Sequence, residues 1–146
     1  MRVMLTGATG FLGGHLVDRL LADSVEVTAV VRSQSGADAL ARRGVRSIVG
    51  ALDDPKAMRD ALRLPTDCVF HVAADTSTWR GHEERQTRTN VEGTRNVLAA
   101  AQATGVRRFV HTSSVSAFGQ QEAMLTERSP RLGKESWINY ERTKAI

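Results

Sequence analysis

The sequence predicts an α/β domain built on a doubly wound parallel sheet. An apolar segment at residues 3–5 enters a glycine-rich turn, and apolar residues then recur at helical spacing over residues 11–21. Strand-like and helix-like segments alternate after this unit, which is typical of a parallel sheet with helices on both faces. Because crossovers between parallel strands are right-handed, the alternation predicts the strand order 3-2-1-4-5. The length of 146 residues suits one domain over residues 1–146.

The elements of the first half have local signals. Residues 25–31 are rich in β-branched side chains and predict the second strand. Residues 37–43 predict a short helix ended by glycine, and residues 45–49 predict the third strand. Asp54 as a cap, with proline at the first helical position, predicts a helix that runs to Leu62.

The second half continues the same alternation. Residues 67–73 predict the fourth strand, and apolar spacing predicts one long helix over residues 83–104. Residues 106–113 predict the fifth strand, followed by a polar loop to about residue 137 and a helix that opens near Tyr140. Ligands of such sheets bind at the carboxyl ends of the strands, so the candidate site residues are those that follow the strands.

The turn after the first strand has the spacing G-x-x-G-x-x-G at Gly7, Gly10 and Gly13. Gly7 can adopt the φ values of a sharp turn, Gly10 lets a ligand approach the backbone, and Gly13 lets the helix lie close to the strand. Free amides at the helix start, together with the helix dipole, favour an anion. We therefore expect a pyrophosphate cradle for a dinucleotide, with an ordinary strand-to-helix turn as the alternative.

Composition excludes several other classes. The net charge is +4 and the sequence pI is about 10.0, but acidic residues are interleaved and no aromatic platform accompanies the arginines. We expect a solvated basic face and no nucleic-acid partner.

The four histidines lack metal-ligand spacing, so no metal is expected. No apolar run is long enough to span a membrane and no signal peptide is evident, which predicts no membrane partner. Cys68, the single cysteine, excludes an internal disulfide and makes a cytoplasmic location the default; its apolar neighbours predict a small buried residue.

Two further signals lie near the end of the chain. Ser113 and Ser114 follow the fifth strand, and Tyr140-x-x-x-Lys144 opens the next helix, where residues four apart share one face. A phenol ordinarily ionises near pH 10, and a lysine ammonium about 4 Å away supplies roughly 4 kcal/mol in favour of phenolate at an effective dielectric of about 20. Taken singly, each signal also fits a serine turn or an exposed tyrosine-lysine pair.

In this order the glycine turn, the serines and Tyr-x-x-x-Lys resemble the extended short-chain dehydrogenase/reductase family, of the NAD(P)-dependent epimerase/dehydratase type. The end of the second strand and the His-Val-Ala-Ala segment resemble the branch of dihydroflavonol reductases and 3β-hydroxysteroid dehydrogenases. The resemblance implies that Ser114 holds a substrate oxygen, that Tyr140 exchanges a proton with it, and that Lys144 favours phenolate and binds the nicotinamide ribose. Ser113 is the competing residue for the serine role.

The end of the second strand carries Arg32 and no carboxylate. The Arg32 guanidinium can pair with a 2′-phosphate, so we expect NADP(H) rather than NAD(H). The alternative is that Arg32 is simply solvated. The family often reads Gly-Asp-Leu after the third strand, whereas this chain has Gly50-Ala51-Leu52, which leaves adenine to the main chain of Leu52 or to Asp53. The expected cofactor-binding residues are Gly7, Thr9, Gly10, Phe11, Leu12, Gly13, Arg32, Leu52, Asp53, Ala73, Ala74, Asn90, Tyr140 and Lys144.

The resulting hypothesis is an NADP(H)-dependent oxidoreductase that transfers a hydride between nicotinamide and a carbonyl or secondary alcohol of a small molecule. The alternatives are a nucleotide-sugar epimerase or dehydratase with tightly held NAD(P), and a non-catalytic NADP-binding regulator. The resemblance covers about the first half of an extended family member. We therefore expect the chain to be an N-terminal part that turns nothing over alone, and a homodimer is a further expectation for the whole protein.

Overall fold

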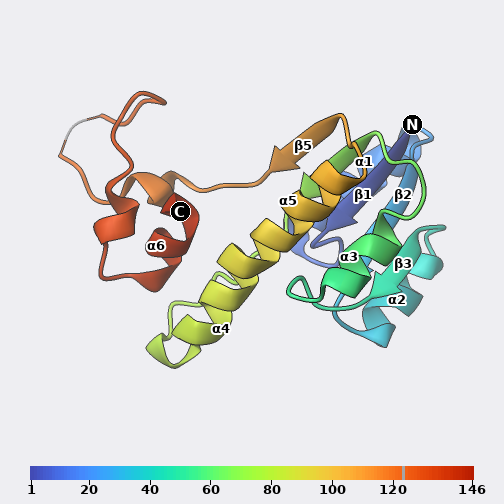
Figure 1. Ribbon diagram of the computed structural model, residues 1–146, viewed down its shortest axis with the longest axis horizontal. Helices are drawn as coiled ribbons and strands as arrows, with labels where there is room; N and C mark the ends of the chain where they lie inside the picture. The colour runs from blue at the N-terminus through green and yellow to red at the C-terminus, as the bar shows by residue number, and fades with distance from the viewer. Residues whose placement is uncertain (123) are drawn as a thin grey trace. The chain divides into compact units, whose positions relative to one another are not determined.

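The computed structural model describes residues 1–122 and 124–146 (Figure 1). Their contacts form two compact units. The first unit is Met1–Ala73 with Gly93–Thr112, and the second is Ala74–Glu92 with Ser113–Ile146. No helix in the described part of the chain is long and apolar enough to cross a membrane. The prediction of one nucleotide-binding domain over residues 1–146 stays a prediction.

The first unit is built on a five-stranded parallel sheet with the order β3-β2-β1-β4-β5, which confirms the predicted topology. In β1 at the centre, Val3 lies opposite Val27 of β2 and Cys68 of β4. The carboxyl ends of all five strands therefore lie at one edge of the sheet. The strands are β1 (Arg2–Thr6), β2 (Glu26–Val31), β3 (Arg46–Val49), β4 (Cys68–His71) and β5 (Arg108–His111).

Helices cover both faces of this sheet. Helices α1 (Phe11–Ala22) and α2 (Gln34–Ala41) pack on the face that carries Leu5 of β1. Helices α3 (Pro55–Ala61) and α5 (Gly93–Ala103) pack on the face that carries Met4. The chain changes faces after β3, so the topological switch point lies between β1 and β4, where ligands of doubly wound sheets bind. Cys68 is buried, as predicted.

The second unit consists of short helical segments around α6 (Asn139–Ala145), which packs against α4 (Glu83–Thr87) and two 3-10 turns. These turns approach each other backbone to backbone, since a Cβ on Gly133 would lie 2.7 Å from the Ala117 carbonyl oxygen. The remaining segments are the 3-10 turns η1 (Arg80–His82), η3 (Val115–Phe118) and η4 (Leu132–Glu135) and the π-helix η2 (Arg88–Glu92).

The predicted long helix over residues 83–104 is present as an unbroken helical run from Glu83 to Ala103, but its middle is π-helical. The π-turn η2 lies between α4 and α5, and Asn90 at its centre directs its amide to Asp75 and Thr143. Single π-turns inside α-helices are frequent at functional sites. The expected polar loop up to residue 137 contains η3 and η4, and its residue 123 lies outside the described residues.

Several boundaries also differ from expectation. Helix α2 begins at Gln34, not at residue 37, because the Ser33 hydroxyl caps it by accepting a hydrogen bond from the Gly36 amide. The fourth strand ends at His71 because β1, its partner, turns away at Gly7. The fifth strand pairs only over Arg108–His111, matching the four residues of β4. The predicted Asp54 cap with proline at the helix start is confirmed.

Candidate functional site

The glycine-rich turn is shaped by close backbone contacts. Gly7 has φ +79°, and a Cβ there would lie 2.7 Å from the Ala73 amide nitrogen, so the turn and the end of β4 meet backbone to backbone. A Cβ on Gly13 would overlap the Gly7 carbonyl, which presses α1 against the turn itself. Gly10 donates from its amide to the Gly7 carbonyl at 3.0 Å. Packing therefore requires glycine at two of the three positions, Gly7 and Gly13.

The start of α1 is open to an anion. Gly10 is the N-cap residue, and neither a side-chain cap nor an acidic residue occupies this first turn. The first intrahelical bond runs from Gly14 to Gly10, which leaves the Phe11 and Leu12 amides for another acceptor. Phe11 is 87% exposed and Leu12 is 51% exposed, so these side chains extend away from the core. The arrangement favours an anion through hydrogen bonds and the helix dipole.

A buried polar network supports the turn, and sequence reasoning did not single it out. The Thr6 hydroxyl lies 2.7 Å from Nδ1 of His71, and Nε2 of His71 lies 2.8 Å from the Thr94 hydroxyl. Thr6 also accepts a hydrogen bond from the Ala73 amide at 3.2 Å. His71 is fully buried and stacks on His111 at 5.2 Å between ring centroids. The network ties the ends of β1 and β4 to α5. Its sequence signal is the presence of polar residues at the ends of otherwise apolar strands.

The residues expected at the adenosine end follow β2 and β3. Arg32 is exposed directly after β2, before the serine that caps α2. Thr9 of the turn lies beside this loop, because a Cβ on Gly36 would be 3.2 Å from its methyl carbon. The Leu52 side chain is buried, so this residue can offer only its main chain, whereas Asp53 is exposed.

Ser114, Tyr140 and Lys144 all lie in the second unit. Ser114 caps η3 by accepting a hydrogen bond from the Ser116 amide at 3.1 Å, and α6, which carries Tyr140 and Lys144, packs against η3. A hydroxyl that accepts one hydrogen bond can still donate its own proton. Ser113 is exposed. The Lys144 ammonium lies 6.0 Å from the Tyr140 ring centroid, and burial lowers the pKa of Lys144.

A hollow of about 110 Å³ lies beside Tyr140 in the same unit. Trp79 and Trp137 line it, and both indoles are largely exposed. The Arg80 guanidinium lies 5.7 Å from the Trp137 ring centroid, which is within cation-π range. Sequence reasoning did not select these residues, although tryptophan three residues before Tyr140 was a usable signal.

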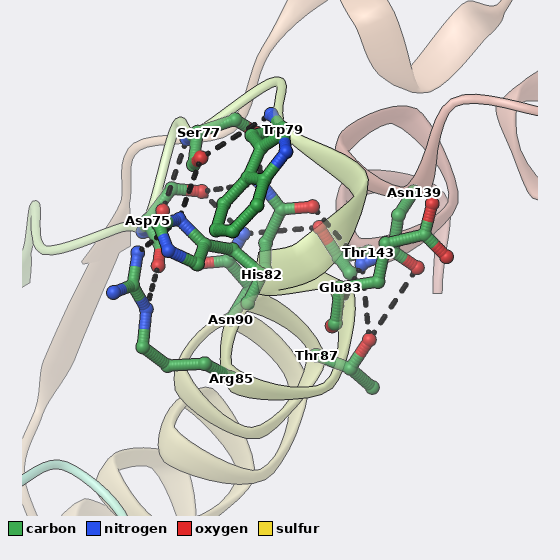
Figure 2. A network of polar contacts seen from close by, with 11 residues as sticks. Asp75, Ser77, Trp79, His82, Glu83, Arg85, Thr87, Asn90, Asn139 and Thr143 are labelled. Atoms are coloured by element: carbon green, nitrogen blue, oxygen red, sulfur yellow. Dashed lines mark hydrogen bonds and ion pairs between the residues drawn. The ribbon is translucent and has the colours of Figure 1, made fainter.

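Asn90 and Ala74 also belong to the second unit. Figure 2 shows Asn90 within a network of polar contacts, and its buried amide exchanges hydrogen bonds with the main chain of Asp75. Burial opposes ionisation of the Asp75 carboxyl, but the Ser77 amide and the Arg85 guanidinium outweigh it and hold its pKa below the usual value. Ala74, adjoining Asp75, is half-buried.

A parallel sheet of this order, with a glycine turn that opens a helix at the switch point, defines a dinucleotide-binding fold of the Rossmann type. The chain belongs to the NAD dependent epimerase/dehydratase family, whose model matches residues 3–145. This confirms the family that the sequence motifs resemble.

Curated relatives include reductases and dehydrogenases. A candidate dihydroflavonol 4-reductase of Synechocystis is 44% identical over 79% of this chain and 33% of its own length. Sterol demethylase protein B of Methylococcus capsulatus is 40% identical over 100% of this chain and 44% of its own length. A 3-beta-hydroxysteroid dehydrogenase of Mycolicibacterium neoaurum is 35% identical over 79% of this chain and 32% of its own length. The chain thus spans less than half the length of these relatives.

The fold is shared with solved structures. A short-chain dehydrogenase/reductase superfamily protein of Agrobacterium tumefaciens, solved with bound NAD, matches with a TM-score of 0.85 and 32% identity. The match covers 99% of this chain and 42% of that one.

Proposed function

We propose that the whole protein is an NADP(H)-dependent oxidoreductase that acts on a carbonyl or secondary alcohol of a small molecule. The observation that carries the proposal is the uncapped, exposed start of α1 over the glycine turn at the switch point. Membership in the epimerase/dehydratase family supports it, as do relatives that are named as a reductase and a dehydrogenase.

Three side chains of the second unit would serve the reaction. When bound, the nicotinamide supplies or accepts a hydride at the substrate carbon. Ser114 donates its proton in a hydrogen bond to the substrate oxygen, and the Tyr140 phenol gives that oxygen a proton in the reductive direction. Lys144 would assist this transfer by placing a positive charge beside the Tyr140 ring, 6.0 Å from its centroid.

The Tyr140→Phe variant of the whole protein tests the enzymatic role. Proton transfer by a positioned side chain contributes about 10²–10⁴-fold, so turnover should fall by that factor while cofactor binding is kept. The assay follows NADPH oxidation with trifluoroacetophenone as a probe carbonyl. Unchanged turnover would refute the role of Tyr140, and an unchanged biological effect with binding intact would favour the non-catalytic regulator.

The NADP(H) preference is proposed from Arg32, which is exposed at the end of β2. Hydrogen bonds to charged groups contribute about 1.5–3 kcal/mol, so Arg32→Ala should weaken NADP⁺ binding roughly 10- to 150-fold. NAD⁺ binding should change little, and Arg42→Ala at the far end of α2 is the matched control. Equal losses for both dinucleotides would contradict the assignment.

The family description also favours a second candidate, a nucleotide-sugar epimerase or dehydratase with a tightly held cofactor. Net consumption of NADPH, and release of the cofactor on dilution, would support the reductase. Redox-neutral turnover with retained cofactor would support the epimerase.

A further inference from the structure

Two rungs of side chains join the segment that contains α4 and η2 to helix α6. In the first, Asn139 donates from Nδ2 to Oε1 of Gln86 at 2.9 Å. In the second, Asn90 donates from Nδ2 to the Thr143 hydroxyl at 3.0 Å. The partners are four residues apart on each side, so the rungs lie one helical turn apart and the two segments run in the same direction. Figure 2 shows Asn139 and Thr143 close to this segment.

The first rung is fixed from both sides. The Gln86 side chain lies in a residue that is 2% exposed, and its Nε2 donates to the carbonyl of Asp75 at 3.1 Å and to that of Ser77 at 2.6 Å. Its oxygen therefore faces Asn139. The Asn139 Nδ2 group also donates to the Glu83 carbonyl at 3.0 Å. Because both donors and the acceptor of the Gln86 amide are used, this side chain has one orientation. It holds Asn139 together with the Glu83 carbonyl and the Thr87 hydroxyl, which accepts from Asn139 at 3.1 Å.

The rungs control the direction in which α6 presents its other side chains. Tyr140 follows Asn139 and Lys144 follows Thr143, so each is rotated by about 100° from a rung position. Helix α6 has seven residues, too few to be stable alone, so its rotation and register depend on contacts with neighbours. Arg142 adds an ion pair to Glu83 at 3.3 Å, at a half-exposed position.

We propose that Gln86 is a positioning residue for the Tyr140–Lys144 pair and acts through Asn139. The inference rests on the proposed function, because it assigns Gln86 to the proton-transfer site of that reaction. It is separate from the bond of Asn90 to Thr143, since the Gln86 rung holds the opposite end of the first turn of α6. Gln86 touches neither substrate nor cofactor in this role; it determines where the phenol is aimed.

The test uses Gln86→Leu and Asn139→Ala in the whole protein, singly and combined. Gln102→Leu, which replaces an exposed glutamine of α5, is the matched control. Turnover of NADPH with trifluoroacetophenone is measured across pH and divided by the number of sites that bind NADP⁺, so that unfolded molecules do not count.

We expect each single variant to lose at least 10-fold in kcat per site, with a displaced pH profile and with NADP⁺ affinity kept within about two-fold. The double variant should lose little more than Asn139→Ala alone, because Gln86 acts through Asn139. Single variants that keep kcat per site and the pH profile, with only stability reduced, would overturn the inference. A double variant whose fold-loss in kcat equals the product of the two single losses would also overturn it.

Tyr140→Phe, measured alongside, separates the two proposals. If it retains wild-type turnover, the proposed function fails. If it is inactive while the Gln86 and Asn139 variants match wild type, the positioning role alone fails. Should wild type leave the probe unreduced, hydrogen exchange of residues 139–145 decides: protection unchanged in Gln86→Leu overturns the inference, and faster exchange than in Gln102→Leu supports it.

Discussion

Two adjacent glycines in α1 give opposite predictions for the same substitution. A Cβ on Gly14 would have the Ala8 carbonyl oxygen as its nearest neighbour, at 3.9 Å, which is ordinary contact. A Cβ on Gly13 would overlap the Gly7 carbonyl oxygen and lie 2.7 Å from its carbon and 3.0 Å from the Ala8 Cα. All of these are backbone atoms, so no side-chain rotation relieves the clash at Gly13.

The magnitudes separate the two variants clearly. Alanine in place of glycine inside a helix gains about 0.5–1 kcal/mol, so Gly14→Ala should raise the free energy of unfolding by that amount. Overpacking costs about 1–3 kcal/mol, and the clash at Gly13 belongs at the upper end because backbone must move. After the helix gain is subtracted, Gly13→Ala should lose about 2 kcal/mol.

The clash at Gly13 should also weaken dinucleotide binding. Relief of the clash moves α1 away from the turn, so the amides that would face the diphosphate move too. Gly13→Ala should weaken NADP⁺ binding at least 10-fold, while Gly14→Ala stays within about two-fold of wild type. Urea denaturation and calorimetric titration of the whole protein measure both quantities. Equal stability of the two variants, or unchanged NADP⁺ affinity of Gly13→Ala, would refute the reasoning.

Three further substitutions have defined outcomes. Asp54→Ala removes the cap of α3 and should cost about 1 kcal/mol of unfolding free energy in urea denaturation, with NADP⁺ affinity unchanged; equal stability would contradict the cap. The Asp75 carboxylate, whose pKa is held below the usual value, stabilises the fold fully above the unfolded pKa of about 4, and this contribution is lost as pH falls through the folded pKa. Asp75→Asn should therefore reduce the loss of unfolding free energy between neutral and acid pH, measured by urea denaturation at several pH values. An unaltered pH dependence would contradict this role of the Asp75 carboxylate. Burial lowers the pKa of Lys144, so its charged ammonium reduces the free energy of unfolding. This reduction is fully present below the folded pKa and disappears as pH rises toward the unfolded value of about 10.4. Lys144→Met should raise the thermal midpoint at neutral pH while abolishing turnover, and a lowered midpoint would count against this account of Lys144.

Sequence patterns predicted the parts of the fold that depend on neighbouring residues. The Gly7 turn, the Asp54 cap and the alternation behind the strand order are local signals, and the structure has all three. The start of α2 was missed because Ser33 lies in a stretch rich in serine and glycine, yet it caps the helix. The long helix was predicted, but its π-helical middle was not, because Asn90 in this stretch bonds to residues distant in the chain.

Sequence patterns likewise predicted some residues of the candidate site but not those that support them. Spacing singled out Tyr140 and Lys144, and the end of a strand singled out Ser114. Their supports were not visible, since Gln86 meets Asn139 across 53 residues of chain and Thr6 meets His71 across 65. Such pairs carry no periodic signal in one sequence. A buried glutamine or histidine is recognised as a support only when its partners are placed in space.

The proposed function depends most on the start of α1, which would bind the diphosphate of a dinucleotide. A crystal structure of the whole protein with NADP⁺ measures this most directly. We expect diphosphate oxygens within hydrogen-bond distance of the Phe11 and Leu12 amides. A diphosphate bound elsewhere would contradict the proposal.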